Sequence, residues 1–472
     1  MIPVPVIAIF DIGKTNKKLF LIDEAYTIVL ERSLQFEEIT DEDGDPCDDI
    51  NQLTKWVTGT LTDVLHLKEY DVRAVNFSAY GASFVYIDEH GKLLTPLYSY
   101  LKKYPGSLQN DLYEKYGGVE KISCETASPL LGSLNSGMQL YRIKKEKPAL
   151  YSQIKYALHL PQYINYLITH HTCTDITSIG SHTLLWNFQK KEYHQWVKAE
   201  GLDYKLAPIL SSDKAGDFIF NNKKLKVGTG LHDSSAALIP YLTVFTEPFI
   251  LLSTGTWCIS LNPFNETPLT NEELKKDCLC YLEYHGRPVK ASRLFAGYEH
   301  EQQVKKLAKH FNKPVDFYKK IKYSAATVKA LKKAYRVDEV SEKKSTGSGG
   351  ENTLHRSNFD SRDLSGFKNY EQAYHCLMLD IIQQQFISTQ LVIQHSGVNR
   401  IFVDGGFSNN SIYMHLLALV FPKLEVYAAS VAQATAMGAA LAIHHAWNPS
   451  PLPADMVKLK FYKIPDSVNT AV

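Results

Sequence analysis

The sequence lacks an excess of charge of either sign. Its 472 residues include 51 lysines and arginines and 50 aspartates and glutamates, a formal net charge of +1. Because charge-driven binding to nucleic acid or anionic membranes needs a clear positive excess, we expect neither partner. No apolar run reaches the ~18 residues of a membrane span, and the opening MIPVPVIAIF lacks the cationic start of a signal peptide. These absences predict a cytoplasmic protein.

Metal-binding and dinucleotide-binding signatures are also missing. The seven cysteines are scattered and odd in number, as in reduced intracellular proteins. Cys278 and Cys280 would share one face of a strand, but no second pair completes a zinc site. Neither the P-loop pattern G-x-x-x-x-G-K-[ST] nor the Rossmann pattern G-x-G-x-x-G occurs, so we set aside both kinds of nucleotide site.

The pattern of apolar runs predicts an α/β protein with a repeated unit. The length suggests two or three domains, and apolar runs at 6–10, 19–22 and 28–30 predict three consecutive strands before a helix over 48–66. The stretch PFILLSTGTWCISL at 248–261 repeats the opening order of strand, polar turn and strand. We therefore expect two duplicated domains facing a shared cleft, at 1–230 and 231–450, followed by a tail at 451–472.

Other segments have simpler signatures. Residues 134–170 and 367–396 have helical periodicity, and the second of these should form one long helix. Residues 411–420 should form another helix. The stretch KKSTGSGGENT at 343–353 is rich in glycine and serine, which is typical of a flexible surface loop.

The run IAIFDIGKTNKKLFLI at 7–22 breaks a buried pattern in its middle. Gly13 and Asn16 could be hairpin-turn residues only. Asp11, however, precedes the turn, and a carboxylate beside a buried strand usually needs a metal, a donor or a substrate. The loop also supplies a hydroxyl group at Thr15, an amide at Asn16 and three cations, which are Lys14, Lys17 and Lys18. These groups suit the binding of a phosphate chain with its metal ion.

Asp233 lies in GTGLHDSSAA, between a glycine-rich turn and an apolar helix. It could be an ordinary helix N-cap, or it could point into a cleft and accept a proton from a hydroxyl. His232 beside it could be a turn residue or a hydrogen-bonding partner of a substrate.

Two further turns contain small and polar residues. STGTW at 253–257 offers hydroxyls and bare backbone to phosphate oxygens, or it is a hairpin turn. In VDGGFSNN at 403–410, paired glycines would let a flat ligand lie against the backbone, although tight strand–helix turns also use Gly-Gly.

In this order and combination, the four segments resemble the FGGY-type carbohydrate kinases, of the superfamily of actin, hexokinase and the heat-shock chaperone ATPases. DIGKTNKK resembles their first phosphate loop, TGLHDSSAAL their catalytic segment, STGTW their second phosphate loop, and VDGGFSNN with AQATAMGAAL their adenosine-binding region. The resemblance runs from about residue 6 to residue 446. The chain departs from the pattern at Lys14, where small or hydroxyl residues are usual, and at Phe407, which replaces the third glycine of a triple.

The resemblance implies two duplicated actin-like (ribonuclease-H-like) domains around a central cleft, with ATP and Mg²⁺ as cofactors. It implies that Asp233 is the general base and that Asp11 and Asp233 face the metal. The implied nucleotide-binding residues are Gly13, Lys14, Thr15, Asn16, Lys18, Thr254, Gly255, Thr256, Gly405, Gly406, Ser408 and Asn410. The implied sugar-contacting residues are Ser78, Tyr80, Gly81, Ala82, Ser83 and His232; Tyr80 could equally be a partly buried core aromatic.

The implied activity is ATP-dependent phosphorylation of a primary hydroxyl of a small sugar by a monomer or homodimer. The chain looks most similar to the rhamnulokinase and fuculokinase branch, which favours L-rhamnulose or L-fuculose. A pentulose (xylulose or ribulose) or a polyol, a non-catalytic sensor of sugar and ATP, and a chaperone-like ATPase are the alternatives.

Overall fold

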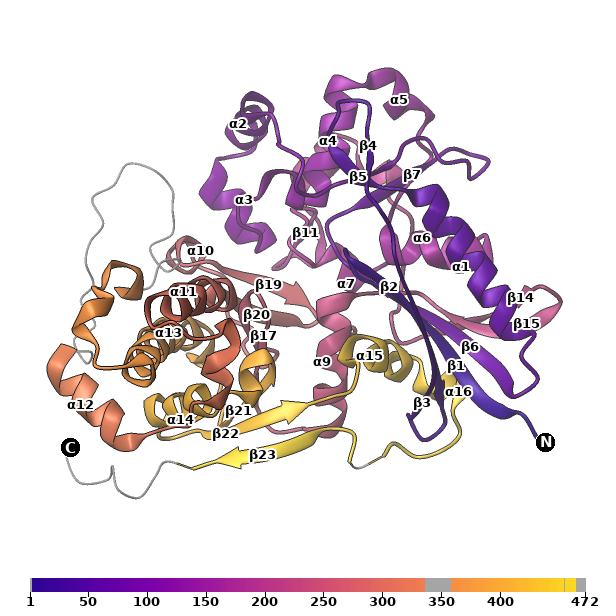
Figure 1. Cartoon of the computed structure of the whole chain (residues 1–472). Helices are drawn as coiled ribbons and strands as arrows, with labels where there is room; N and C mark the ends of the chain where they lie inside the picture. Colours follow the sequence, from indigo (N-terminus) through magenta and orange to yellow (C-terminus); the bar gives the residue numbers. More distant parts are fainter. Residues whose placement is uncertain (1, 336–357, 454, 464–472) are drawn as a thin grey trace.

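The computed structural model describes residues 2–335, 358–453 and 455–463. They form two sheet-containing domains with helices on both faces of each sheet (Figure 1). The expected flexible loop at 343–353 lies outside these ranges.

The first sheet has the order β14-β15-β6-β1-β2-β3, with β16 also paired to β6. Strands β1 to β3 form an antiparallel meander, whereas β6 is parallel to β1, and both β15 and β16 are parallel to β6. The bounds are β1 (Val4–Ile12), β2 (Asn16–Asp23), β3 (Ile28–Gln35), β6 (Tyr70–Ala79), β14 (Ala215–Phe220), β15 (Lys223–Gly228) and β16 (Leu231–His232).

The second sheet repeats this plan in the order β19-β20-β18-β17-β21-β22-β23. Strands β17, β18 and β20 form an antiparallel meander, β21 is parallel to β17, and β22 is parallel to β21. The bounds are β17 (Phe249–Thr254), β18 (Cys258–Asn262), β19 (Cys278–Leu282), β20 (Pro288–Leu294), β21 (Arg400–Gly405), β22 (Glu425–Ser430) and β23 (Lys458–Tyr462). Because β17 and β21 match β1 and β6, the predicted duplicated α/β fold is confirmed.

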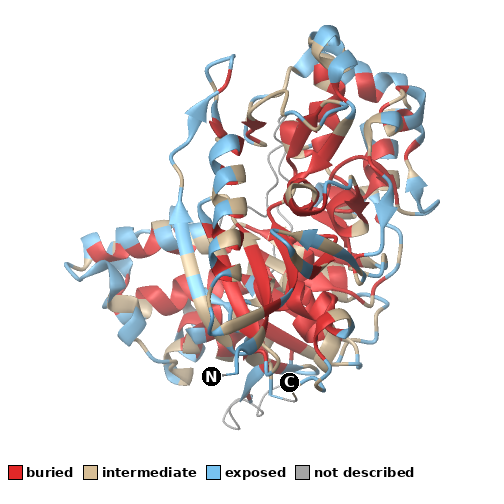
Figure 2. Ribbon diagram, turned by 90° about the vertical axis from the view of Figure 1, so that its right-hand side faces the viewer, coloured by how far each residue is buried: buried red, intermediate tan, exposed pale blue. Residues whose placement is uncertain are grey.

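Strand β1 shows why the sheets are buried on both faces. Its apolar run alternates sides, so that Val6, Ala8 and Phe10 pack with α1 (Ile50–Leu65) and α6 (Leu160–Thr169). Ile7 and Ile9 point to the opposite face. There they meet α9 (Asp233–Val244), α15 (Ala434–Ala442) and α16 (His444–Trp447). Figure 2 shows the same arrangement, with buried residues in the central strands and exposed residues on the outer helices and loops.

Helix α9 is shared by both sheets. Ala236 and Ile239 pack on the first sheet, whereas Leu238 and Tyr241 pack on the second. Helix α15 lies beside α9 between the sheets (Figure 1). The two backbones are in direct contact, because a Cβ added at Gly438 would lie 1.8 Å from the Ala236 carbonyl oxygen.

The long helix α13 (Tyr370–Ile393) confirms the helix expected over 367–396. It is long and apolar enough to cross a membrane by length and composition, but most of it is buried in the second domain, and core helices of soluble proteins pass the same test. It packs with α11 (Ala296–His310), α12 (Ala325–Tyr335) and α14 (Ser411–Val420), and α14 coincides with the helix expected at 411–420.

The first domain carries an additional layer of short elements. The helices are α2 (Gly106–Lys115), α3 (Val119–Thr126), α4 (Ser136–Glu146), α5 (Pro148–Gln153), α7 (Ile176–Ile179) and α8 (Gln195–Ala199). The main short strands are β4 (Ile39–Thr40), β5 (Pro46–Asp48), β7 (Phe84–Ile87), β8 (Leu97–Tyr98) and β9 (Tyr156–His159).

Two expectations are corrected. Residues 134–170 are not helical throughout, because β9 separates α5 from α6 and pairs with β7. The expected tail at 451–472 contains β23, which pairs with β22 and closes the edge of the second sheet. In both cases the strand forms by pairing with another strand that is distant in the sequence.

The contact between α9 and α15 predicts opposite effects for two glycine substitutions. Gly438→Ala should lower the free energy of unfolding by about 1–3 kcal/mol or more, because an added methyl overpacks a backbone contact. Gly59→Ala is the control. Gly59 is exposed in α1 with open space around it, so alanine should raise the free energy of unfolding by about 0.5–1 kcal/mol. Denaturant unfolding measures both, and equal stability of the two variants would contradict the contact.

Candidate active site

Two carboxylates from distant parts of the chain meet at one edge of the first sheet. Asp11 lies near the end of β1, in register with Ser78 on β6 and with Lys18 on β2. Asp233 follows β16, which pairs with β6 at Ser78 and Ala79. Burial and, second, the charge of Asp233 raise the pKa of Asp11 to about 7, although Lys18 and the Ser78 hydroxyl oppose the shift.

Asp233 is the first residue of α9 and not its N-cap, which is His232. Its Oδ1 accepts a hydrogen bond from the Ser234 backbone N–H at 2.6 Å and lies 3.2 Å from Nε2 of His232. The N-terminal end of the helix dipole favours a negative charge at this position. The side chain remains 34% exposed, so the carboxylate can meet a ligand from solvent.

The predicted sugar-contacting residues fall into two groups. Gly81 faces the predicted substrate residue His232, because a Cβ at Gly81 would lie 2.9 Å from the imidazole ring. The Ser83 hydroxyl is buried and has no hydrogen-bond partner among the described residues. Tyr80 and Ala82, by contrast, are turned inward. The Tyr80 hydroxyl donates to Asp48 at 2.8 Å, which fits the interpretation as a buried aromatic, and the Ala82 carbonyl accepts a hydrogen bond from Gln139.

Three histidines around this site are uncharged. Burial, with the neighbouring His232 as a smaller cause, lowers the pKa of both His159 and His182 to about 3. Burial also lowers the pKa of His232, against Asp233 and Asp175, which raise it. The His182 ring stands edge-on to His232, with 6.4 Å between the ring centroids, and its Nδ1 has no hydrogen-bond partner among the described residues. Of the three, His232 lies next to Asp233, and His182 lies behind His232.

The first loop is a tight hairpin turn. The Gly13 N–H donates to the Asn16 carbonyl at 2.9 Å, and the Asn16 side chain accepts from Gln35. Thr15 and Asn16 are exposed at the tip. The hairpin interpretation thus describes the backbone, and the Thr15 side chain is exposed at the tip of the turn.

All three lysines of the first loop lie beside carboxylates, and Lys17 Nζ is 3.5 Å from Asp48. Lys14 Nζ lies 2.7 Å from Asp48 and 2.8 Å from Glu38, and Lys18 lies 3.1 Å from Glu31. The sequence gives no signal for this contact of Asp48, because acidic residues at 48–49 are typical of a helix start. Asp49 is indeed the N-cap of α1, whereas the preceding carboxylate turns inward.

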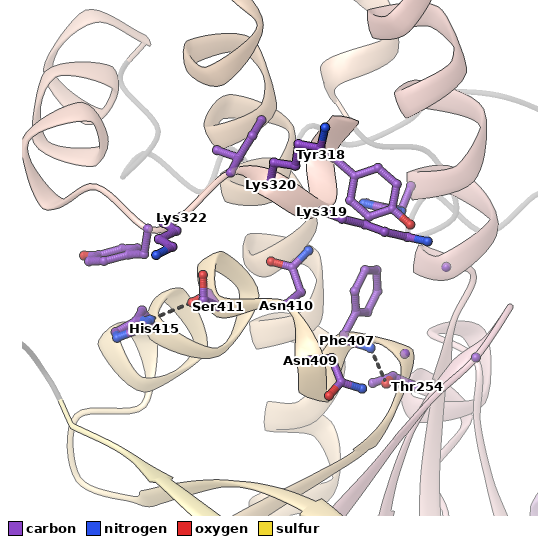
Figure 3. A pocket seen from close by; sticks show the side chains of 16 residues that line it. Thr254, Tyr318, Lys319, Lys320, Lys322, Phe407, Asn409, Asn410, Ser411 and His415 are labelled. Atoms are coloured by element: carbon purple, nitrogen blue, oxygen red, sulfur yellow. Dashed lines mark hydrogen bonds between the residues drawn. The ribbon is translucent and has the colours of Figure 1, made fainter. Parts of the chain in front are cut away.

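A pocket of about 930 Å³ opens in the second domain (Figure 3). Of the predicted nucleotide-binding residues, Thr254, Gly255, Gly406 and Asn410 line it. The opposite wall is the segment 318–323, part of which is the short helix η3 (Val315–Lys320). This segment was missed, because a charged run such as YKKIKY is usually a solvated face.

Several polar groups around this pocket hold the loops together. Thr254 Oγ1 donates to the Asp404 carbonyl at 2.6 Å and accepts from the Phe407 N–H at 3.0 Å. Asn410 caps α14 and donates to the Tyr374 hydroxyl at 2.7 Å. Ser408 donates to the Gly405 carbonyl at 2.7 Å. These side chains shape the pocket, whereas Gly255 and Thr256 are exposed beside it.

Glycine at 405 is required, and phenylalanine at 407 is accommodated. Gly405 has a φ of 88°, and a Cβ there would lie 2.0 Å from the Thr254 carbonyl oxygen. Phe407 stacks on Tyr413 at 4.5 Å and meets the edge of His300 at 5.2 Å. It is buried, so its ring forms part of the pocket wall without filling the pocket.

The pair of carboxylates fits a magnesium ion. Proteins usually hold Mg²⁺ through one or two carboxylates together with substrate phosphates and several waters. Asp11 and Asp233 supply two carboxylates, and a bound cation would oppose both burial and the charge of Asp233, which raise the pKa of Asp11. Over 2–335, 358–453 and 455–463, no group of three or more His, Cys, Asp or Glu side chains is placed to hold a metal alone.

Comparison with known families gives two adjoining matches. A model of the N-terminal domain of the FGGY family of carbohydrate kinases matches residues 6–239, and a model of the FGGY C-terminal domain matches residues 246–347. The rhamnulokinase of Halalkalibacterium halodurans is 25% identical over 262 residues, 53% of this chain and 54% of the relative. The L-fuculokinase of Salmonella typhi is 26% identical over 275 residues, 53% and 55% respectively. The chain thus spans about half the length of the curated relatives it matches.

Solved structures are similar over nearly the whole chain. A carbohydrate kinase from Novosphingobium aromaticivorans has a TM-score of 0.80 at 22% identity, covering 99% of this chain and 96% of that one. A xylulose kinase from Lactobacillus acidophilus has a TM-score of 0.75 at 15% identity, covering 98% and 94%. These likenesses show the fold: two actin-like domains.

The neutral histidines predict a loss of stability in acid. Above pH 6.5 a histidine is neutral in both the folded and the unfolded state and contributes nothing. Between pH 6.5 and about 3 the unfolded state binds a proton that folded His182 rejects. The free energy of unfolding should therefore fall by about 1.4 kcal/mol per pH unit for this residue.

Unfolding measured from pH 7 to pH 4 checks this, with His182→Asn as the variant. Asparagine tolerates the left-handed backbone at this position, where φ is 49°. The variant should show a shallower pH slope than the parent protein. Parallel slopes would mean that His182 is protonated in the folded state.

Proposed function

Because the chain belongs to the FGGY family of carbohydrate kinases, we propose that it transfers the γ-phosphoryl group of ATP to a hydroxyl of a small sugar. The observation that carries the proposal is the meeting of Asp11 and Asp233 where β1 and β16 end. Phosphoryl transfer requires positioning and charge neutralisation more than covalent chemistry by the protein. A pair of partly exposed carboxylates and a pocket with a glycine backbone provide for both.

Asp233 is the general base in this proposal. Its partly exposed carboxylate accepts the proton of the attacking sugar hydroxyl, and the short bond from the Ser234 N–H keeps it oriented. Such a base contributes roughly 10²–10⁴-fold to the rate. Asp11, with Asp233, would hold Mg²⁺, which supplies positive charge to the phosphate oxygens when bound.

The sugar lies against His232 and Gly81 in this proposal. The neutral imidazoles and the unpartnered Ser83 hydroxyl suit uncharged hydroxyl groups better than a carboxylate. The nucleotide occupies the 930 Å³ pocket, which is lined by Gly255 and Gly406 on one side and by the segment 318–323 on the other.

A ketose is the favoured acceptor. The curated relatives are named as kinases of rhamnulose and L-fuculose. Solved structures of the same fold are named as xylulose and gluconate kinases, so a pentulose or a sugar acid competes with the deoxy-ketohexoses. We propose a cytoplasmic monomer or homodimer with sugar and ATP as its partners.

Coupled ADP release from Mg-ATP should identify the acceptor. The panel is L-rhamnulose, L-fuculose, D-xylulose, L-ribulose and D-ribulose, with glycerol and gluconate as comparison compounds and a no-sugar blank. One ketose should raise turnover far above the blank. ATP binding with no response to any compound would favour the non-catalytic sensor, and ADP release that ignores sugar would favour the chaperone-like ATPase.

Asp233→Asn tests the base. The amide keeps the size of the side chain but cannot accept the proton, so kcat should fall by roughly 10²–10⁴-fold, with nucleotide affinity nearly unchanged. Asp213→Asn, at a partly exposed carboxylate of the first domain that none of the proposed roles uses, is the matched control. Turnover of the Asp233 variant near that of the control would remove Asp233 from the role.

A further inference from the structure

The positive charge available to the nucleotide has to come from somewhere other than the first loop. Lys14 is neutralised by Asp48 and Glu38, and Lys18 lies beside Glu31 and Asp11. The nucleotide of the proposed reaction nonetheless brings several negative charges on its phosphates. Binding these charges tightly requires cations or oriented backbone N–H groups.

Three lysines of the segment 318–323 line the nucleotide pocket. Lys319, Lys320 and Lys322 all belong to its wall, and all three are exposed. In Figure 3, Lys319 extends above Phe407 on the side where Thr254 lies, whereas Lys322 lies at the opposite end, near His415. The lysines thus cover the length of the pocket.

No negative charge offsets them. None of the side chains described as lining the pocket is acidic, and within the described part of the chain none of these three lysines has an ion-pair partner. Two lysines on the neighbouring helix α11 behave differently, since Lys305 pairs with Glu301 and Lys306 pairs with Asp360. The other polar lining groups, such as Asn409 and Ser411, are neutral. The pocket therefore has a net positive wall, which a neutral adenosine alone does not require.

We propose that Lys319, Lys320 and Lys322 form an anion-binding wall that holds the phosphate chain of a nucleoside polyphosphate, in place of the engaged lysine at position 14. This inference rests on the proposed function for the identity of the nucleotide. The wall raises the local concentration of the anion and stabilises its bound state, and salt screens both effects.

The test is direct binding of ATP, ADP and adenosine to the full chain without sugar, at 50 and 300 mM salt. The variant is the triple Lys319→Gln, Lys320→Gln, Lys322→Gln. The matched control replaces three other exposed lysines of the same domain that do not line the pocket, Lys309, Lys329 and Lys368, by glutamine. Thermal unfolding of each protein confirms that the variants are folded.

The triple variant should bind ATP about tenfold more weakly than the parent chain at 50 mM salt, since exposed charge pairs contribute modestly and three are lost. ADP should lose less, adenosine should bind equally to all three proteins, and the salt dependence should flatten only in the triple variant. An ATP affinity within twofold of the parent, or an equal loss in the control, would overturn the wall.

These outcomes separate the two proposals. If turnover depends on sugar but the triple substitution does not weaken ATP binding, the anion-binding wall is refuted and the kinase activity is supported. Lysine-dependent ATP binding with no sugar-dependent turnover supports the wall and refutes the kinase. A parent chain that binds neither ATP nor ADP refutes both.

Discussion

The crossing of α9 and α15 determines how the rest of the molecule is arranged. Because Gly438 lets the two backbones touch at Ala236, α15 reaches the first sheet, where the Asn76 side chain donates to the Ala439 carbonyl at 2.7 Å. Helix α9 is held on both sides, by the first sheet through Ile239 and by the second sheet through Tyr241. A helix fixed in this way points its first residue, Asp233, at a single place, the end of β1.

The site formed there concentrates unfavourable electrostatics. Burial and a neighbouring carboxylate together raise the pKa of Asp11, and burial lowers the pKa of His159 and His182, which lie near His232. Perturbed groups of this kind gather at functional sites, because the environment that suits the ligand-bound state does not suit the empty protein. By contrast, the opposite charges of Lys14 and Asp48 form an ion pair within the protein. Asp11 thus remains in an unfavourable electrostatic environment, whereas Asp48 has a cationic partner within the protein.

Local pattern predicted most of the architecture. The two strand–turn–strand repeats, the helix α1 and the long helix α13 follow from the hydrophobic periodicity alone. The order of the four motifs along the chain pointed to the carboxylates of Asp11 and Asp233. Long-range contacts decided what was missed. Strand β23 forms by pairing with β22, and the inward position of Asp48 depends on its contacts with Lys14 and Tyr80. The segment 318–323 can be assigned to the pocket only from the fold, which places it opposite Gly406. By residue type, Thr254 and Asn410 could either contact a ligand or support a loop. Their hydrogen-bond partners show that they support the loops.

The position of α15 also bears on how the chain folds as it is synthesised. The face of the first sheet that contains Ile7, Ile9 and Phe20 is covered partly by α9 and partly by residues 436–447, and the latter leave the ribosome more than 400 residues later. Domains usually fold in order from the N-terminus during translation, but this sheet can close only one face early. At ordinary elongation rates of about 5–20 residues per second, the part of the other face that α15 and α16 cover stays open to water for tens of seconds. A nascent chain of this kind is a natural client for chaperones that shield apolar surface until the last helix arrives.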